Sequence, residues 1–184
     1  MKKVLFAAVA ALVMAASCGP KDFVFIQMSD PQIGYKDKTE GYRRSDSLMM
    51  LAVGDINRIK PEVVIVTGDL VNHTYDSLQV AIYSRDIKQI DPEIPVYAIP
   101  GNHDMRPWTP ENHEAFLKFN GYERFSFKLH DCAFIGFDTC CIKDGIELIT
   151  CGSVGKPLHG GYSGINIIRV TKDNYYCEYK PLGI

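Results

Sequence analysis

Three short polar segments carry side chains that can hold metal ions and move protons. They are Asp30-Pro31-Gln32, Gly68-Asp69-Leu70-Val71-Asn72 and Gly101-Asn102-His103-Asp104. Carboxylate, amide and imidazole groups of this kind are ligands for divalent cations. Two such cations about 3.5–4 Å apart clamp a phosphate and lower the pKa of a bound water toward 7. The segments therefore predict a metal site for hydrolytic chemistry.

Four of these residues are the predicted metal ligands. Asp69 is the strongest candidate, because a carboxylate that follows a buried strand and a glycine, Gly68, can reach two cations at once. Asp30 would supply a second carboxylate, while Gln32 and Asn102 would add neutral amide oxygens. Oxygen-rich ligands of this kind suit several divalent ions, so the identity of the metal stays open.

Two neighbouring residues are the predicted catalytic pair. His103, beside Asn102, is suited to donate a proton to a leaving oxygen or to hold the phosphate. Asp104 is expected to orient that imidazole, as acids often do for histidines. Each segment taken alone is also ordinary turn chemistry. Their occurrence in this order, each after an apolar run, favours the metal site over three coincidental turns.

The elements around the segments predict where they meet. Apolar runs at Phe23–Met28, 63–66 and Val96–Ile99 read as strands, and 41–59 and 75–90 read as helices between them. This β-α-β-α-β order predicts a parallel sheet, with each polar segment just past the carboxyl end of a strand. Ligands bind at that edge in open α/β sheets.

The later half of the chain predicts mostly strands. The expected elements are a helix over 111–119, a hairpin made of 124–129 and 132–137, and strands over 146–150, 165–170 and 175–179. The fold class is therefore α/β, with a β-rich later half.

Helical spacing also predicts the buried faces of the first two helices. These faces consist of Leu48, Leu51, Ala52, Ile56 and Ile59 in the first helix, and of Leu78, Ala81, Ile82 and Ile87 in the second. Beyond Cys18 the cysteines are odd in number, and Cys132, Cys151 and Cys177 are expected to be small buried hydrophobic residues.

Residues 1–17 predict a signal peptide of the lipoprotein type. A positive start, Met1-Lys2-Lys3, precedes an apolar run over 4–16, which is shorter than the roughly 20 residues of a membrane-spanning helix. Small residues then lead to Cys18, which resembles a bacterial lipoprotein processing site and would carry the lipid. A short linker over 18–22 would join it to one domain over 23–184. A plain secretory signal with an incidental cysteine is the alternative.

This organisation predicts a location and excludes one class of ligand. The lipid anchor would hold the protein to a membrane on the periplasmic side of the bacterial cell envelope; without it the protein would be secreted to the periplasm. A net charge of −2, with no basic run beyond Arg43-Arg44, gives no electrostatic support for nucleic acid as a ligand.

The order Asp-x-Gln, Gly-Asp-x-x-Asn, Gly-Asn-His-Asp resembles the signature of the calcineurin-like metallophosphoesterases. Ser29-Asp30-Pro31-Gln32 is similar to a subgroup of that family that reads Ser-Asp-Pro-Gln. The resemblance covers about 23–138 and returns over 145–170. It implies a layered α/β/β/α sandwich of two packed sheets, phosphoester substrates, and divalent ions of the manganese, iron or zinc class.

The resemblance also implies a role for each matching residue. Asp30, Gln32 and Asp69 would hold one ion. Asp69 and Asn102 would hold the other, and His103 would be the catalytic acid or a phosphate ligand.

The chain departs from the family pattern after the predicted hairpin. The pattern has two later histidine motifs that complete both ion shells, and neither is present in this sequence, which looks internally shortened around 139–144. We therefore expect a reduced second sheet, fewer than two tightly bound ions, and open sheet edges that favour self-association.

Three functions remain open at this point. The first is a metal-dependent hydrolase of phosphoester bonds (a metallophosphoesterase or phosphatase) with an incomplete dinuclear site and low activity. The second is a non-catalytic envelope lipoprotein that keeps the phosphoesterase scaffold as a binding module. The third is a shortened form of a longer enzyme that is not stable by itself.

Overall fold

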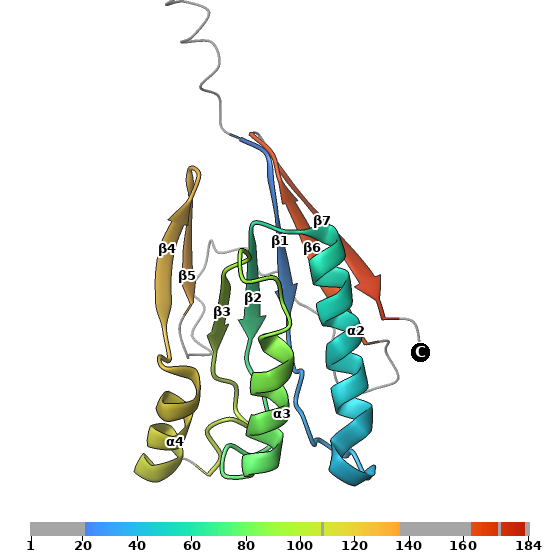
Figure 1. Cartoon of the computed structure of the whole chain (residues 1–184). Helices are drawn as coiled ribbons and strands as arrows, with labels where there is room; N and C mark the ends of the chain where they lie inside the picture. The colour runs from blue at the N-terminus through green and yellow to red at the C-terminus, as the bar shows by residue number, and fades with distance from the viewer. Residues whose placement is uncertain (1–20, 108, 137–162, 173, 183–184) are drawn as a thin grey trace, which may run out of the picture.

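Three parallel strands form the centre of the fold. The computed structural model describes residues 21–107, 109–136, 163–172 and 174–182. In it β1 (Phe23–Met28) pairs with β2 (Val63–Thr67), which pairs with β3 (Val96–Ile99), all in parallel. The carboxyl ends of the three strands point to the same edge of the sheet (Figure 1). The predicted β-α-β-α-β order is confirmed.

Two antiparallel strands extend this sheet on the side of β1. They are β6 (Gly164–Val170) and β7 (Tyr175–Pro181), which give the strand order β3-β2-β1-β6-β7. The predicted strands over 165–170 and 175–179 are confirmed. The predicted strand over 146–150 lies outside the described residues.

The helix α2 (Arg43–Ile59) follows a short 3-10 turn, η1 (Glu40–Tyr42), and packs on one face of the sheet. Its buried residues Met49, Ala52, Val53 and Ile56 belong to the same apolar cluster as Ile26, Met28, Val64 and Val66 of the strands. The prediction that Leu51 is buried was wrong, because this side chain is 44% exposed. Leu51 lies on the outer side of the helix, while Met49 and Val53 complete the inner one.

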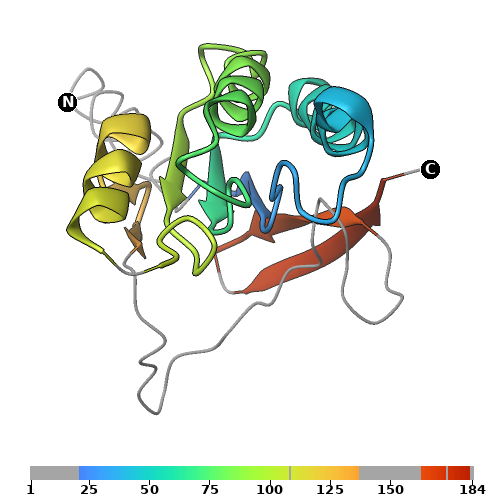
Figure 2. The ribbon, with the colours of Figure 1, turned by 90° about the horizontal axis from the view of Figure 1, so that it is seen from below.

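The helix α3 (Ser77–Ile87) lies beside α2 on the same side of the sheet (Figure 2). Asp76 caps its first turn by accepting hydrogen bonds from the backbone N–H groups of Leu78 and Gln79. Leu78 and Ala81, predicted to be buried, are exposed. Ile82 is buried and Ile87 is partly buried, as predicted, and the other buried residues of the helix are Gln79, Tyr83 and Asp86.

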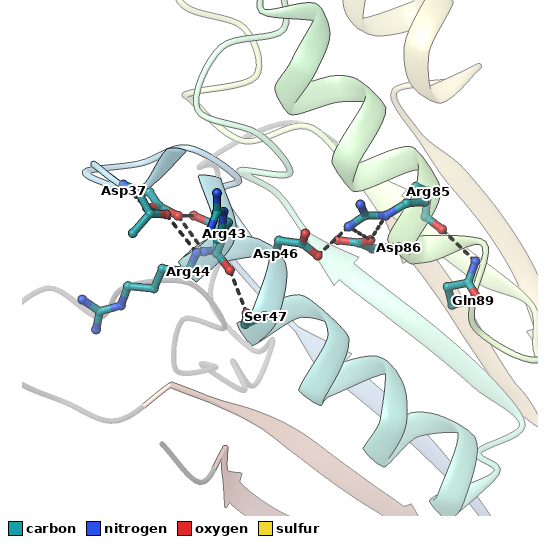
Figure 3. A network of polar contacts seen from close by, with 10 residues as sticks. Asp37, Arg43, Arg44, Asp46, Ser47, Arg85, Asp86 and Gln89 are labelled. Carbon is teal, nitrogen blue, oxygen red and sulfur yellow. Dashed lines mark hydrogen bonds and ion pairs between the residues drawn. The ribbon is translucent and has the colours of Figure 1, made fainter. Parts of the chain in front are cut away.

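The buried polar residues explain this error. Gln79 accepts a hydrogen bond from the backbone N–H of His73 and donates one to Asp76, so it is satisfied inside the protein. Asp86 is bound by Arg85, which also pairs with Asp46 of α2 (Figure 3).

The hairpin of β4 (Phe125–Leu129) and β5 (Cys132–Gly136) forms a second, two-stranded sheet. It packs by aromatic rings on the sheet face opposite to α2 and α3. Ring centroids are 5.1 Å apart for Phe25 and Phe134 and 4.3 Å apart for Tyr97 and Phe127. The predicted α/β fold class is confirmed, and within the described residues the second sheet consists of β4 and β5.

The helix α4 (Pro110–Asn120) contacts α3 through Phe119, whose ring lies 5.5 Å from that of Tyr83. Thr109 caps the start of α4, and Gly121 ends it in a left-handed conformation. Figure 1 shows α4 next to α3, below the β4–β5 hairpin.

Two cysteines test the expectation of burial. Cys132 is half-buried, whereas Cys177 is exposed on β7, the outermost strand of the sheet. The expectation was therefore wrong for Cys177. Cys151, Cys18 and the predicted signal peptide lie outside the described residues. Within the described ranges, no helix has the length and apolar character needed to cross a membrane.

Candidate metal centre

The loop after β1 and the loop after β2 are joined by backbone hydrogen bonds. The N–H of Asp30 donates to the carbonyl of Gly68 at 3.1 Å, and the N–H of Gln32 donates to the carbonyl of Asp69 at 2.8 Å. A parallel bridge between Ile33 and Val71 follows. The pairing of the two strands thus continues past their ends and brings the first two polar segments side by side.

The loop after β3 reaches the same point because two glycines allow close approach. A Cβ on Gly101 would lie 2.1 Å from Oδ1 of Asp69, and a Cβ on Gly68 would lie 2.8 Å from Cα of Gly101. Gly68 also has a φ of +88°, which favours glycine. Any side chain at either position would push the loops apart.

Three residues of the first two segments adopt the left-handed backbone conformation. Asp30 has a φ of 51°, Gln32 of 43° and Asp69 of 51°. Such values are uncommon for residues other than glycine, and they cluster at functional sites. The loops are therefore held in a specific, unfavourable conformation around these side chains.

Asp69 is bound from both neighbouring loops. Its Oδ2 accepts a hydrogen bond from Nε2 of Gln32 at 3.3 Å, and its Oδ1 accepts one from the backbone N–H of His103 at 2.9 Å. Asp69 is only 8% exposed. For Gln32 to bind a metal through Oε1, its amide group would have to turn by half a rotation from this position.

Asp30 lies close enough to Asp69 for their charges to interact. Burial raises the pKa of Asp30; a hydrogen bond from Ser29 opposes this, the negative charge of Asp69 raises it further, and His103 lowers it. Two carboxylates that repel each other at the end of a buried strand pair are what a cation would stabilise.

Asp104 has no exposed surface, and its carboxylate binds backbone groups. Oδ2 accepts hydrogen bonds from the N–H of Leu70 at 3.1 Å and of Gly101 at 2.8 Å, and Oδ1 accepts one from Val71 at 3.1 Å. Burial raises the pKa of Asp104 to about 7, although these three donors favour the charged form.

These contacts give Asp104 a different role from the predicted one. Its carboxylate ties the loop after β2 to the loop after β3, so its bonds go to the backbone. The sequence could not reveal these bonds, because the donors are backbone N–H groups of two separate segments and do not depend on the type of side chain. The carboxylate of Asp104 thus holds the two loops together, and its predicted role in orienting His103 stays a prediction.

The imidazole of His103 is half-buried and lies against a residue that the sequence analysis missed. Its ring centroid is 5.2 Å from that of Tyr35, and the ring planes are 72° apart. Tyr35 follows Gln32 by three residues in the same loop. Asn102 is exposed on the loop between Gly101 and His103.

A family model described as calcineurin-like phosphoesterase matches residues 23–182. The match covers all the elements and loops described above. The chain belongs to the calcineurin-like phosphoesterase family.

Curated relatives are similar to parts of this family member. A serine/threonine-protein phosphatase CPPED1 from Danio rerio is 32% identical over 121 residues, which are 57% of this chain and 39% of the relative. The Bos taurus protein of the same name is 30% identical over 138 residues, 66% of this chain and 44% of the relative. A probable glycerophosphodiester phosphodiesterase GpdQ from Arcobacter nitrofigilis is 29% identical over 122 residues, 63% of this chain and 43% of the relative.

The matches thus span less than half the length of these relatives. Calcineurin-like phosphoesterases as a family use divalent metal ions. In the part of the chain that the structure describes, no group of three or more His, Cys, Asp or Glu side chains is placed to hold an ion. The candidate donors are the carboxylates of Asp30 and Asp69 and the amides of Gln32 and Asn102. This set fits an oxygen-binding divalent cation held partly by water.

Proposed function

We propose that this chain is a metal-dependent hydrolase of phosphoester bonds with a reduced metal centre. The observation that carries the proposal is the position of Asp69. Its carboxylate is bound by Gln32 from one loop and by His103 from another, and the charge of Asp30 reaches it. In a family of metal-dependent phosphoesterases, this is the arrangement expected of a shared ligand.

Each residue at this edge has a proposed role. Asp30, Gln32, Asp69 and Asn102 would hold the metal, which would supply polarisation of the phosphoester and a water of lowered pKa. His103 holds the phosphate or gives a proton to the leaving oxygen. Its backbone N–H is fixed on Asp69, so the imidazole starts from a defined position.

The reduced ligand set predicts slow turnover. Two carboxylates and two amides are few for two ions, since such metals usually take three or four protein ligands each. We therefore propose fewer than two tightly bound ions of the manganese, iron or zinc class. Relatives named as a protein phosphatase and as a probable phosphodiesterase support phosphoesters as the substrate class, monoester or diester.

The small number of carboxylates also supports a second candidate, a non-catalytic binding module. In this version the protein keeps the scaffold, is anchored to the envelope through a lipid on Cys18, and binds a phosphorylated ligand or a partner. Self-association through open sheet edges belongs to the same proposal. In the described residues β7 lies at one edge of the five-stranded sheet, and an edge strand is where another strand could add.

Metal content and hydrolysis separate the two candidates. The purified chain would be analysed for metal per chain after incubation with manganese, and assayed for manganese-dependent hydrolysis of p-nitrophenyl phosphate. The control is Asp69→Asn, which keeps the shape of the side chain and removes its charge. Bound metal and turnover that are both lost in this variant support the hydrolase. Activity equal in both proteins rejects Asp69 as a metal ligand of the hydrolase, and no turnover at any metal concentration rejects the hydrolase and favours the binding module.

The anchor has its own test. Expression of the full chain in a bacterial host with labelled palmitate should label the wild-type protein and not a Cys18→Ser variant. A protein that is unlabelled and found in the soluble periplasmic fraction would instead support the plain secretory signal.

A further inference from the structure

The imidazole of His103 needs a partner that fixes its orientation. A proton donor is effective only when its ring is held close to the productive geometry. The carboxylate next to it in sequence, Asp104, is fully buried and engaged by three backbone N–H groups from Leu70, Val71 and Gly101. The hydrogen bonds of this carboxylate thus go to the backbone, and the ring of His103 contacts a different residue of the site.

Tyr35 is in contact with that ring. The two ring centroids are 5.2 Å apart and the planes are inclined by 72°, which is the edge-to-face arrangement that aromatic pairs prefer. The backbone N–H of His103 is fixed on Asp69 at 2.9 Å. The backbone bond and the ring contact together restrain both ends of the residue.

The position of Tyr35 is itself fixed from several sides. Its backbone N–H donates to the carbonyl of Gln32 at 2.9 Å, so the turn that carries a proposed metal ligand also carries this ring. The neighbouring Gly34 donates its N–H to Oγ of Ser45 at 3.3 Å. The ammonium of Lys36 lies 5.0 Å from the centroid of the Tyr35 ring, a cation–π contact that favours the observed ring position.

The lack of a side chain at Gly34 lets this loop lie close to the first turn of α3. A Cβ at this position would come within 2.5 Å of Nε2 of Gln79, and its φ is +93°. Gln79 in turn accepts the N–H of His73, so the loops before α2 and before α3 are packed as one unit. The Tyr35 ring therefore projects from a rigid base.

We propose that Tyr35 is a positioning residue that holds the imidazole of His103 in its working orientation. The catalytic consequence rests on the proposed function, whereas the ring contact does not. The contact depends on the aromatic ring of Tyr35 and not on its hydroxyl group. A phenylalanine at this position should therefore keep the orientation of His103, and an aliphatic side chain should not. The cation–π contact of Lys36 with the Tyr35 ring helps to keep that ring in place.

The contact is tested by NMR on the full chain at a fixed pH. The ring protons of Tyr35 and His103 should show a nuclear Overhauser effect in the wild-type protein, which needs no variant. Among the five histidines of the sequence, His103 is assigned by the loss of its signal in His103→Gln. In Tyr35→Leu the His103 ring signal should shift through loss of the ring current, and in Tyr35→Phe it should stay close to the wild-type position.

Tyr75 provides a matched control. Its ring is stacked on that of His73 with centroids 4.9 Å apart. Tyr75→Leu should move the signal of His73 and leave that of His103 unchanged. A missing Overhauser effect, a His103 signal that is unmoved in Tyr35→Leu, or a Tyr35→Phe protein that behaves like Tyr35→Leu would each overturn the proposal.

Turnover separates this proposal from the proposed function. In an active protein, Tyr35→Leu should lower kcat about tenfold or more with KM within about twofold, because misorientation of a catalytic group affects the chemical step. Tyr35→Phe should restore most of kcat. An unchanged kcat in Tyr35→Leu overturns the positioning role. A wild-type protein without turnover overturns the proposed function instead, while the NMR result still decides whether Tyr35 orients His103.

Discussion

Asp104 and Asp86 are both without exposed surface, but their surroundings differ. Asp104 lies at the carboxyl edge of the parallel strands and accepts three backbone hydrogen bonds from two loops. Asp86 lies on α3, where Arg85 binds one of its oxygens and also pairs with Asp46. Among the described residues, the other oxygen of Asp86 has no hydrogen-bond partner.

The difference shows what a buried charge does in each region. At the site, the carboxylate of Asp104 satisfies three backbone donors, and it fixes the loops that carry Asp69 and His103. Between the helices, Asp86 shares a single arginine with another acid. Burial raises the pKa of Asp86, Arg85 opposes that effect, and the charge of Asp46 raises it again. Burial disfavours both charges, but three backbone hydrogen bonds make the carboxylate of Asp104 structural, whereas that of Asp86 has fewer partners among the described residues.

The largest expected effect comes from breaking the loop contact that Asp104 secures. Gly101→Ala should destabilise the protein by about 3 kcal/mol, because the new Cβ would overlap Asp69 and overpacking of such contacts is costly. Metal-dependent hydrolysis should be lost with it. Chemical denaturation measures the free energy of unfolding.

Gly54→Ala is the control for this substitution. Gly54 lies in α2 and nothing would lie within 4 Å of its Cβ, so alanine should stabilise by about 0.5–1 kcal/mol. If Gly101→Ala were as stable as Gly54→Ala, the close approach of the two loops would be disproved.

The second prediction is that Asp104→Asn destabilises by about 2 kcal/mol. An asparagine presents an NH₂ group where one carboxylate oxygen now accepts from the backbone, so at least one buried donor loses its partner. The free energy of unfolding and the thermal midpoint would both report this. An Asp104→Asn protein of wild-type stability would show that the three backbone bonds are dispensable.

The elements of the fold could be predicted because hydrophobic pattern decides them. The strands Phe23–Met28 and Val96–Ile99 were predicted with their observed bounds, since each is an apolar run closed by a polar turn. The converging segments followed from the topology, because parallel strands end at one edge. Pattern alone was sufficient wherever apolar burial decides the structure.

The same pattern failed where buried polar groups decide the structure. The face of α3 was misassigned because Gln79 and Asp86 are buried among polar partners while Leu78 is exposed. The role of Asp104 and the contact of Tyr35 with His103 depend on residues from separate loops. No periodicity in one segment encodes such contacts, so the sequence could name the candidate residues but not their partners.

The third prediction makes the same chemical change in the other region. Asp86→Asn should stabilise the protein by about 1 kcal/mol at neutral pH. Oδ1 can still accept from Arg85, and the new NH₂ group can donate to the nearby Asp46 in place of charge repulsion. The change in the free energy of unfolding would thus have the opposite sign to that of Asp104→Asn. Urea unfolding of both variants in one buffer measures the two changes.

The pH dependence of this gain gives a second check. The pKa of Asp86 is raised, so its destabilising charge is present above that pKa and is removed by protonation as the pH falls. The advantage of Asp86→Asn should therefore shrink at acidic pH. Asp46→Asn, a change at the partly exposed partner, should alter stability by less than about 0.5 kcal/mol. Equal destabilisation by Asp86→Asn and Asp104→Asn would remove the distinction between the two regions.

The smallest expected effect on stability concerns the carboxylate of Asp37, which is less buried than those of Asp104 and Asp86. Asp37 is partly exposed in the loop that carries Tyr35, and it accepts hydrogen bonds from the backbone N–H groups of Thr39 and Ser45 at 2.9 and 2.7 Å. Burial alone would raise the pKa of Asp37, but the hydrogen bonds from Thr39 and Ser45 outweigh it and lower the pKa to about 2. Figure 3 shows this side chain beside the first turn of α2.

Asp37→Asn should destabilise by about 0.5 kcal/mol at neutral pH, a value reduced by solvent screening of the exposed group. Because the folded pKa is below the ordinary value of 3.8, the stabilisation is present above pH 3.8 and is lost as the pH falls through about 2. The difference between wild type and variant should therefore close over that interval in urea unfolding. Glu93→Gln, at an exposed carboxylate, is the control variant. A stability difference between wild type and Asp37→Asn that stayed constant down to pH 2 would contradict this prediction. It would mean that the charged and the neutral forms of Asp37 hold the loop equally well. Asp37 would then resemble neither the structural charge of Asp104 nor the unfavourable charge of Asp86.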